Sequence, residues 1–259
     1  MTSPGKIAVA GGTGLVGRLV VAALRERGDE PVVLARSTGV DLTTGAGLGA
    51  ALDGCTAVVD VSNVTTTRRA VAEGFFDAAT THLVAAARRA GAGHLVVLSI
   101  VGIDDVDLGY YAGKRRQEQV VRAGAVPWTV LRATQFHEFA GQYAGGVRGP
   151  VLAVPSMLSR PVAAQEVAAR LADLVAAGPG GDAPPFAGPR TMHLADMVRG
   201  YLRATGRRAL VMPVRLPGAA GRAAARGALV PAAPFDAGTR TFEEYLAALG
   251  ETQRLRAAR

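Results

Sequence analysis

Residues 6–36, KIAVAGGTGLVGRLVVAALRERGDEPVVLAR, decide how the rest of the chain folds. A short apolar run, Ile7–Ala10, leads directly into four glycines at positions 11, 12, 14 and 17, and the amphipathic stretch Leu15–Arg27 follows. This order predicts a strand, a tight turn and a helix, with a second strand after them. Glycines at this spacing also let a phosphate approach the free N–H groups at the start of the helix. The stretch therefore predicts a dinucleotide-binding turn.

The glycines allow two other interpretations. The first is a tight turn that binds nothing. The second is a nucleotide-triphosphate loop, because Gly12 and Gly17 have the spacing that such a loop requires, but Arg18 and Leu19 stand where Lys and Ser or Thr are needed. Leu19 cannot ligate magnesium, so this loop is excluded. The residues expected to contact the dinucleotide here are Gly11, Thr13, Gly14, Leu15, Val16 and Gly17.

The bulk composition sets limits on the class of protein. The 259 residues are 49% hydrophobic and 19% charged, which fits one large α/β domain, or a nucleotide-binding domain with a small appendage. No apolar run approaches the roughly 20 residues that span a bilayer, and Met1–Gly5 has no signal pattern, so we expect a cytoplasmic protein without a membrane partner. The single Cys55 excludes an intrachain disulfide, and four scattered histidines give no metal-ligand spacing. No metal site is predicted.

The net charge of +8 raises the question of nucleic acid. The arginines are spread along the chain and are not clustered with aromatic residues, so we expect a solvated basic surface that attracts an anionic cofactor, and no nucleic-acid partner. Only Lys6 and Lys114 among the 29 basic residues are lysines. Because the chain uses arginine wherever a general positive charge is sufficient, Lys114 is a candidate for a specific role.

Arg36 indicates which cofactor is bound. It follows the predicted second strand, Pro31–Ala35, at the end where NAD-selective proteins carry an acidic residue on the ribose hydroxyls. A cation at this position favours the 2′-phosphate of NADP(H), and an ordinary surface arginine is the alternative. Asp41, followed by Leu42, lies in the next loop and could accept the adenine amino group.

Polar residues follow the predicted third strand, Ala57–Val61. In a doubly wound parallel sheet, Val61, Ser62 and Asn63 would lie at the carboxyl edge beside the cofactor. Further along, a helix over Phe75–Ala90 leads to a buried strand, His94–Ile100.

Tyr110 and Lys114 are candidates for proton transfer. They lie four residues apart at the start of a helix that ends near Ala123, so they share one face. An ammonium beside a phenol would lower the phenol pKa, and Ser99, near the end of the preceding strand, would orient the substrate oxygen. The alternative is that Tyr110 or its neighbour Tyr111 only packs against the core.

Together these motifs resemble the atypical short-chain dehydrogenase/reductases of the NmrA-like, NAD(P)-binding type. The resemblance covers essentially the whole chain, and the segments that carry it are GGTGLVG, VVLAR, the VDL loop, VVDVSN, LSIVGID, YYAGK and PWTVLRATQFHEF. The resemblance implies a Rossmann fold in which Asp41 binds adenine, Val61–Asn63 covers the ribose side, and a Y-x-x-x-K pair transfers a proton. The Ser99 to Tyr110 spacing of 11 residues is shorter than usual, which leaves Tyr110 and Tyr111 as alternative donors.

The same resemblance divides the chain. Residues 1–134 form the expected NADP-binding core, and residues 135–259 form a small substrate-binding region interleaved with it. The fifth strand, Trp128–Leu131, is followed by Ala133 and Thr134, which would pass the nicotinamide. Beyond them, Phe136 and His137 could contact substrate together with Tyr111, although His137 is equally well explained as a core residue. The stretch Gly178–Pro189 is expected to be a surface loop.

These expectations define an NADP(H)-dependent oxidoreductase that transfers a hydride to or from a small carbonyl or conjugated substrate. Tyr110, Lys114 and Ser99 would be the catalytic residues, and Lys114 would also hold the cofactor ribose. Two alternatives are a regulatory protein that senses NADP(H) without turnover and an epimerase or isomerase that uses its bound cofactor transiently. A monomer or a homodimer is expected.

Overall fold

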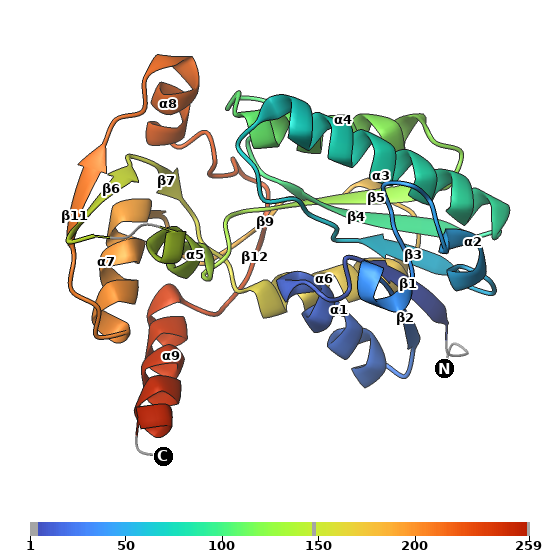
Figure 1. Ribbon diagram of the computed structural model, residues 1–259, viewed down its shortest axis with the longest axis horizontal. Coiled ribbons are helices and arrows are strands. Elements are labelled where there is room, and N and C mark those ends of the chain that lie inside the picture. The colour runs from blue at the N-terminus through green and yellow to red at the C-terminus, as the bar shows by residue number, and fades with distance from the viewer. Residues whose placement is uncertain (1–4, 147–148, 258–259) are drawn as a thin grey trace.

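A parallel sheet is the centre of the molecule in the computed structural model, which describes residues 5–146 and 149–257 (Figure 1). Met1–Pro4, part of the segment that lacks a signal pattern, lies outside the described residues. Among the described residues the sheet has eight strands, and every pairing in it is parallel. Seven strands follow the order β12 (Asp236–Ala237), β9 (Phe186–Ala187), β5 (Trp128–Ala133), β4 (His94–Ile100), β3 (Ala57–Asp60), β1 (Lys6–Ala10) and β2 (Glu30–Leu34), while β8 (Gly181–Asp182) pairs with β5 outside this path.

Helices cover both faces of this sheet. On one face, α1 (Leu15–Glu26) and α6 (Ala164–Ala177) bury a cluster of Val, Leu and Ala side chains. On the other face, α2 (Leu48–Ala51), α3 (Arg69–Arg89) and α4 (Gly109–Ala123) cover a second cluster. Because both faces are covered, the central strands carry almost continuous apolar runs. The predicted doubly wound α/β fold is confirmed.

The strand order creates a switch point at β1. This strand pairs with β2 on one side and with β3 on the other, so the chain leaves β1 in opposite directions across the sheet. Ligands of doubly wound sheets bind at such a point, beyond the carboxyl ends of the strands. The glycine turn that follows β1 lies at this location.

A second packing unit, here called the C-terminal lobe, lies beside one end of the sheet (Figure 1). It has its own apolar cluster, which also takes in Ile103, Val106 and Tyr111 from the amino-terminal half of the chain. In the opposite direction, α6 and three short strands return from the second half of the chain to the sheet, so packing crosses residue 134 both ways. The lobe contains α5 (Phe139–Gly146), β6 (Val151–Pro155), β7 (Leu158–Ser159), β10 (Met192–His193), α7 (Leu194–Ala204), β11 (Leu210–Val214), α8 (Gly218–Ala225) and α9 (Phe242–Ala257).

Two elements differ from the sequence expectations, the stretch Gly178–Pro189 and the start of α3. The stretch Gly178–Pro189 is not only a surface loop, because β8 and β9 within it extend the sheet. Helix α3 begins at Arg69, one and a half turns before the expected Phe75. The last helix begins with a capping box, since the Glu244 N–H donates to Thr241 Oγ1 and the Glu244 carboxylate accepts the Thr241 N–H.

Candidate functional site

The glycines of the turn have different structural roles. Gly11 has a φ of +76°, and a Cβ there would lie 2.8 Å from Ser62 Cα, so this glycine lets the turn pack against the end of β3. A Cβ on Gly17 would lie 2.1 Å from Gly11 O, which α1 cannot accommodate. Gly14 is exposed, and a Cβ there would meet only Gly11 O, at 3.2 Å. The fold requires Gly11 and Gly17, whereas Gly14 leaves space on the side open to a ligand.

The start of α1 is arranged for an anion. Gly14 is the N-cap and offers no side chain, and the first turn contains no acidic residue. The N–H groups of that turn therefore have no partner within the helix, and they carry the positive end of its dipole. The guanidinium of Arg18 donates to Thr13 O and adds a positive charge beside the turn. The residues present fit a pyrophosphate.

The loop after β2 brings two predicted cofactor residues to the same side. Arg36 begins a short 3-10 helix, Arg36–Thr38, and its side chain is exposed. Asp41 Oδ1 accepts hydrogen bonds from the N–H and the hydroxyl of Thr43, at 2.8 and 2.6 Å, and these bonds hold the Asp41 pKa below its usual value. Leu42 differs from the expectation because its side chain is buried in the core.

The end of β3 carries a buried carboxylate that the sequence analysis did not single out. Asp60 Oδ1 accepts the Ser62 N–H at 2.9 Å, and Oδ2 accepts the Gln117 side-chain amide at 2.8 Å. Ser62 is buried, and its hydroxyl has no partner among the described residues. A charged residue that ends an otherwise apolar strand, AVVD, was the available signal. Asp60 shapes the turn that holds Asn63 at the surface.

Tyr110 lies at the edge of this turn. Its hydroxyl donates to Asn63 Oδ1 at 2.7 Å, and its ring meets Phe76 edge-on, with 6.0 Å between the ring centroids. Burial raises the Tyr110 pKa above its usual value. The phenol therefore keeps its proton at neutral pH.

Lys114 does come from the same helix, one turn further on, but its ammonium is directed into the protein. The side chain is only 4% exposed, and Nζ donates to Leu98 O at 2.6 Å and to Gln117 Oε1 at 2.5 Å. Nζ also lies 4.8 Å from the centroid of the Phe76 ring. Burial lowers the Lys114 pKa to about 8, although Asp60 and Glu118 act in the opposite direction. The sequence predicted that Lys114 would lower the Tyr110 pKa. The structure differs from this prediction, because the Lys114 ammonium is bonded to Leu98 O and Gln117.

Ser99 also differs from its expected role. It is 1% exposed, and its hydroxyl lies beside the buried Glu118 carboxylate, where it helps to lower the pKa of that carboxyl. Side chains alternate along a strand, so Ser99 lies on the same face of β4 as Leu95 and Val97, under the α3–α4 layer. In this arrangement the hydroxyl faces the core instead of a substrate.

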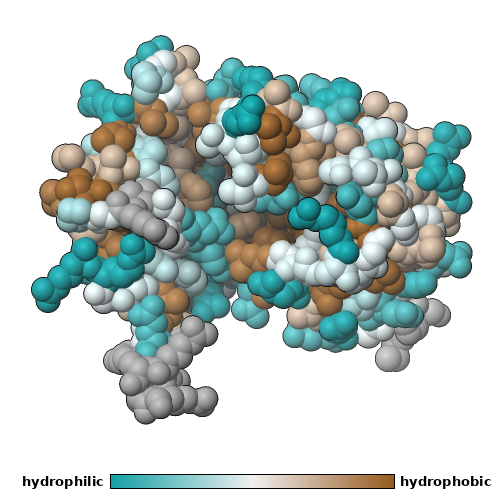
Figure 2. All heavy atoms as spheres, in the orientation of Figure 1, coloured by the Kyte–Doolittle hydropathy of each residue, from teal (hydrophilic) through white to brown (hydrophobic). Residues whose placement is uncertain are grey.

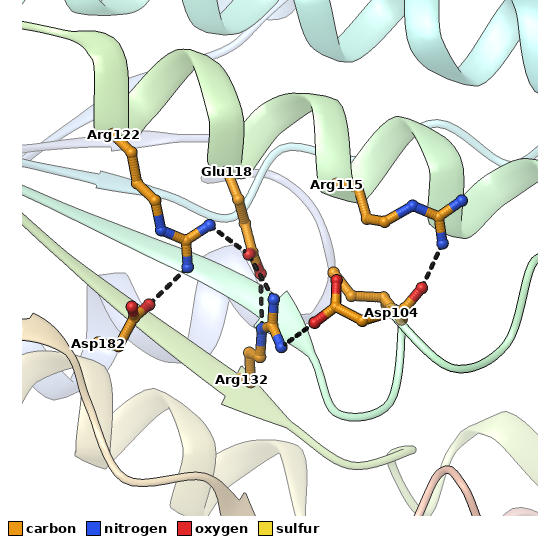
Figure 3. A network of polar contacts seen from close by, with 7 residues as sticks. Asp104, Arg115, Glu118, Arg122, Arg132 and Asp182 are labelled. Atoms are coloured by element: carbon orange, nitrogen blue, oxygen red, sulfur yellow. Dashed lines mark hydrogen bonds and ion pairs between the residues drawn. The ribbon is translucent and has the colours of Figure 1, made fainter.

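A network of ion pairs holds α4 against the sheet (Figure 3). The buried carboxylate of Glu118 accepts from Arg132 on β5 and from Arg122 on α4, at 2.7 Å each. Arg132 also pairs with Asp104 in the loop before α4, and Arg122 pairs with Asp182 on β8. Burial raises the Glu118 pKa, but hydrogen bonds from Arg132, Ser99 and Arg122 together outweigh burial and keep the pKa below its usual value. The network fixes the direction in which α4 presents Tyr110.

Four residues predicted to line the nicotinamide or the substrate, Tyr111, Ala133, Thr134 and Phe136, are buried or partly buried. Ala133 and Thr134 are buried, and the Thr134 hydroxyl donates to Arg160 O at 2.5 Å, so neither side chain faces an open cleft. Tyr111 is buried in the C-terminal lobe, which raises its pKa to about 12. Phe136 is partly buried against the first core cluster.

His137 is buried but lines a cavity. Its Nε2 lies 3.3 Å from Pro161 O, its ring packs against Phe242 and Tyr245, and its Nδ1 has no partner among the described residues. The cavity has a volume of about 310 Å³ and lies between α1, α6 and α9, with Leu15 of the glycine turn in its lining. Because His137 and Leu15 line the same cavity, His137 lies near the end of the molecule where the cofactor is expected.

The described residues give no support for a metal centre or a membrane span. No group of three or more His, Cys, Asp or Glu side chains within residues 5–146 and 149–257 could hold a metal ion. In the same part of the chain, no helix is both long enough and apolar enough to cross a bilayer.

A glycine turn at the switch point of a parallel sheet, followed by an uncapped helix, defines a dinucleotide-binding α/β protein. Residues 11–177 match the family described as NAD(P)H-binding, and the chain belongs to this family. A curated relative from Streptomyces griseus subsp. griseus, (4-alkanoyl-5-oxo-2,5-dihydrofuran-3-yl)methyl phosphate reductase, is 31% identical over 219 residues, which cover 78% of this chain and 74% of the relative. The relative and the family match together support an oxidoreductase with a nicotinamide cofactor.

Solved structures agree on the fold. Triphenylmethane reductase from Citrobacter sp., complexed with NADP(H), superposes with a TM-score of 0.67 at 16% identity over 94% of this chain and 99% of that one. UDP-glucose-4-epimerase from Stenotrophomonas maltophila, with bound NAD, gives a TM-score of 0.71 at 14% identity over 98% and 99%. The NAD(P)-binding family expected from the sequence is confirmed by the family match, and these two neighbours show that the fold accommodates either cofactor.

Proposed function

We propose that the protein is an NADP(H)-dependent oxidoreductase that transfers a hydride to or from a small carbonyl or conjugated organic substrate. The observation that carries the cofactor choice is Arg36, which is exposed just beyond the carboxyl end of β2, where an acidic residue would favour NAD. The substrate class is supported by the Streptomyces griseus relative, whose name describes the reduction of an oxygenated dihydrofuran.

The residues that would hold the cofactor follow from the site. The first-turn N–H groups of α1 and the open side of Gly14 would bind the pyrophosphate, and Arg36 would pair with the 2′-phosphate. Asp41 would accept the adenine amino group with the oxygen that Thr43 does not use. The bound nicotinamide supplies the hydride.

Tyr110 is the candidate proton donor. Its raised pKa keeps the phenol protonated at neutral pH, so it can donate to an oxygen that gains negative charge during reduction. In the structure this proton is directed to Asn63 Oδ1, and donation to a substrate requires the hydrogen bond to exchange. Lys114, bonded to Leu98 O and Gln117, would support α4 on the side that faces the sheet, and its ammonium would have to exchange these bonds to contact the ribose.

A regulatory protein without turnover is the second candidate. The observation that favours it is the arrangement of Lys114 and Ser99, since both face the core and neither contacts Tyr110 through a hydrogen bond in the described residues. Such a protein would bind the cofactor normally and change shape or partner without chemistry.

One experiment separates these functions. Purified protein is titrated with NADPH and NADH by calorimetry, and is then screened against enones, quinones and aromatic ketones while the absorbance of the reduced nicotinamide is followed. Substrate-dependent loss of that absorbance with NADPH supports the oxidoreductase. Tight NADPH binding with no turnover across the whole panel favours the sensor, and tighter binding of NADH contradicts the cofactor assignment.

A further inference from the structure

The outer side of the C-terminal lobe contains a cavity of about 540 Å³ that is shallow and widely open to solvent. The end of α7 and the segment that leads into β11 line it, and small-molecule sites typically measure about 300–1,000 Å³. Arginine dominates the lining, which includes Arg199, Arg203, Arg207 and Arg208. Apart from these arginines, the lining is apolar.

The arginines present free hydrogen-bond donors. Arg199 is held by Asp196 Oδ1 at 2.8 Å and Val211 O at 3.1 Å, and Arg207 is held by Ala144 O at 3.2 Å. These bonds use only some of the five N–H donors of each guanidinium and fix where the remaining ones point. Arg203 and Arg208 make no ion pair among the described residues, and no acidic residue of that part of the chain lines the cavity. The cavity is therefore strongly cationic and suited to a phosphate or carboxylate.

An apolar patch continues from the rim of the cavity. Four large apolar side chains are exposed in the described part of the chain, and three of them are Val151 (42%), Leu210 (64%) and Met212 (50%). Leu210 lies opposite Val151 in the β6–β11 pairing, and Met212 is two residues further on, so all three lie on one face of this small sheet. Leu210 also lines the cavity. Figure 2 shows apolar side chains at this edge of the lobe, where Figure 1 locates β6 and β11.

Two simpler explanations account for part of this surface only. An arginine in the last turn of a helix stabilises the helix dipole, which explains Arg203 in α7 but not the exposed apolar residues. A symmetric contact between two copies would cover Leu210 and Met212, but it would also bring two sets of four arginines together in a chain with a net charge of +8.

We propose that this cavity and the adjoining patch bind a monomeric amphiphilic anion, with its phosphate or carboxylate head among the arginines and its alkyl or acyl chain over Val151, Leu210 and Met212. The head would form charge-assisted, partly bidentate hydrogen bonds, and the chain would remove exposed apolar surface from water. This site is separate from the glycine turn, so the inference does not depend on the proposed reaction.

Calorimetry with three probes tests both halves of the proposal. Octyl phosphate, kept below its micelle concentration, is expected to bind the wild-type protein at least about 10-fold more tightly than inorganic phosphate, because eight methylene or methyl groups gain a partly apolar contact. Octyl glucoside, which has the same chain and a neutral head, is expected not to bind. Equal binding of octyl glucoside would overturn the requirement for an anion.

Paired variants locate the site. The double change Arg203→Ala with Arg208→Ala is expected to weaken octyl phosphate binding by about 10-fold or more. The control pair, Arg222→Ala on α8 with Arg226→Ala just after it, removes the same charge from exposed positions of the same lobe and should have no effect. Leu210→Gln with Met212→Gln should remove the preference for octyl phosphate over inorganic phosphate, and Val71→Gln is the control for an exposed apolar residue elsewhere.

Three results would overturn the proposal: no binding of octyl phosphate to the wild-type protein, equal losses in the two arginine pairs, or binding to anionic phospholipid vesicles without binding to monomeric octyl phosphate. The first and third results need only the wild-type protein, so they can overturn the proposal even if a variant fails to fold.

Discussion

The glycine turn after β1 and the start of α4 both face the carboxyl edge of the sheet, but they are prepared for a ligand to different degrees. In the turn, the N–H groups of Gly11, Gly12 and Gly14 are bonded to backbone carbonyls, but the first-turn N–H groups of α1 have no partner within the helix and Gly14 has an open side. At α4, the polar side chains are already bonded within the protein, Tyr110 to Asn63 and Lys114 to Leu98 O and Gln117. A site built from backbone is fixed by the fold, whereas a site built from long side chains depends on which partner they bind.

This difference separates binding from chemistry. Cofactor binding should depend mainly on the turn, and on α4 only through the proposed contact of Lys114 with the ribose, while turnover should depend on whether Tyr110 can leave Asn63 for a substrate. The predictions below test that separation, from the largest expected effect to the smallest.

Replacing Tyr110 by Phe keeps the ring that packs against Phe76 and removes the proton. If Tyr110 is the donor, turnover should fall by roughly 10²–10⁴ while NADPH affinity is unchanged. Steady-state kinetics and calorimetry on the same preparation measure both quantities. Tyr111→Phe, in the core of the C-terminal lobe, is the matched control and should have a much smaller effect on turnover. Full activity of the Tyr110 variant would remove Tyr110 from the mechanism.

Alanine substitutions at two glycines of the turn should have different effects, one on NADPH binding and one on folding. Gly14→Ala adds a methyl group on the open side, so NADPH affinity should fall by at least about 100-fold in a folded protein. Gly17→Ala forces a Cβ against Gly11 O, so the fold itself should be lost or severely destabilised. Circular dichroism and NADPH titration distinguish the two outcomes. Normal NADPH affinity in folded Gly14→Ala would show that the phosphate lies elsewhere.

Arg36→Ala tests the cofactor choice within the binding region. A charge-assisted contact with the 2′-phosphate typically contributes about 1.5–3 kcal/mol, so NADPH should bind about 10- to 100-fold more weakly. NADH lacks this phosphate and serves as the internal control, with little change expected. An equal loss for both cofactors in parallel titrations would mean that Arg36 supports the loop and does not read the phosphate.

The buried Lys114 should leave a signature in the pH dependence of stability. Its pKa is lowered from 10.5 to about 8, so between these values the unfolded state binds more protons, and the free energy of unfolding rises as pH increases. From pH 8 to pH 9.5 this contribution should be about 1–2 kcal/mol. Urea denaturation across this range should show the rise in the wild-type protein relative to Lys114→Met. Parallel curves for the two proteins would argue that the ammonium is not buried in solution.

Most of the fold followed from local pattern, and the errors have physical causes. The switch from an apolar run to a glycine turn and an amphipathic helix predicted β1 and α1 closely. The strands β8 and β9 were missed because each has only two residues within a stretch rich in Gly and Pro, and tertiary pairing with β5 is what makes them strands. No local signal contains that information.

The site shows a similar division. Gly14, Arg36 and Asn63 are exposed at the predicted carboxyl edge, because strand ends and turns determine their location. The direction of Ser99 could have been predicted, since alternation along His94–Ile100 groups it with Leu95 and Val97. The bonds of Lys114 to Leu98 O and Gln117 could not, because they depend on how α4 settles on the sheet through Glu118 and Arg132.

The return of late segments to the central sheet has a consequence for how the protein is made. Because β12, at residues 236–237, pairs with β9, the edge of the sheet is completed only after most of the chain has left the ribosome. Helix α6 likewise covers α1 from a distance of well over 100 residues. Long-range pairing of this kind slows folding and leaves apolar surface exposed during synthesis. A nascent chain that stops in the C-terminal lobe should thus be a substrate for chaperones, even though its glycine turn was synthesised first.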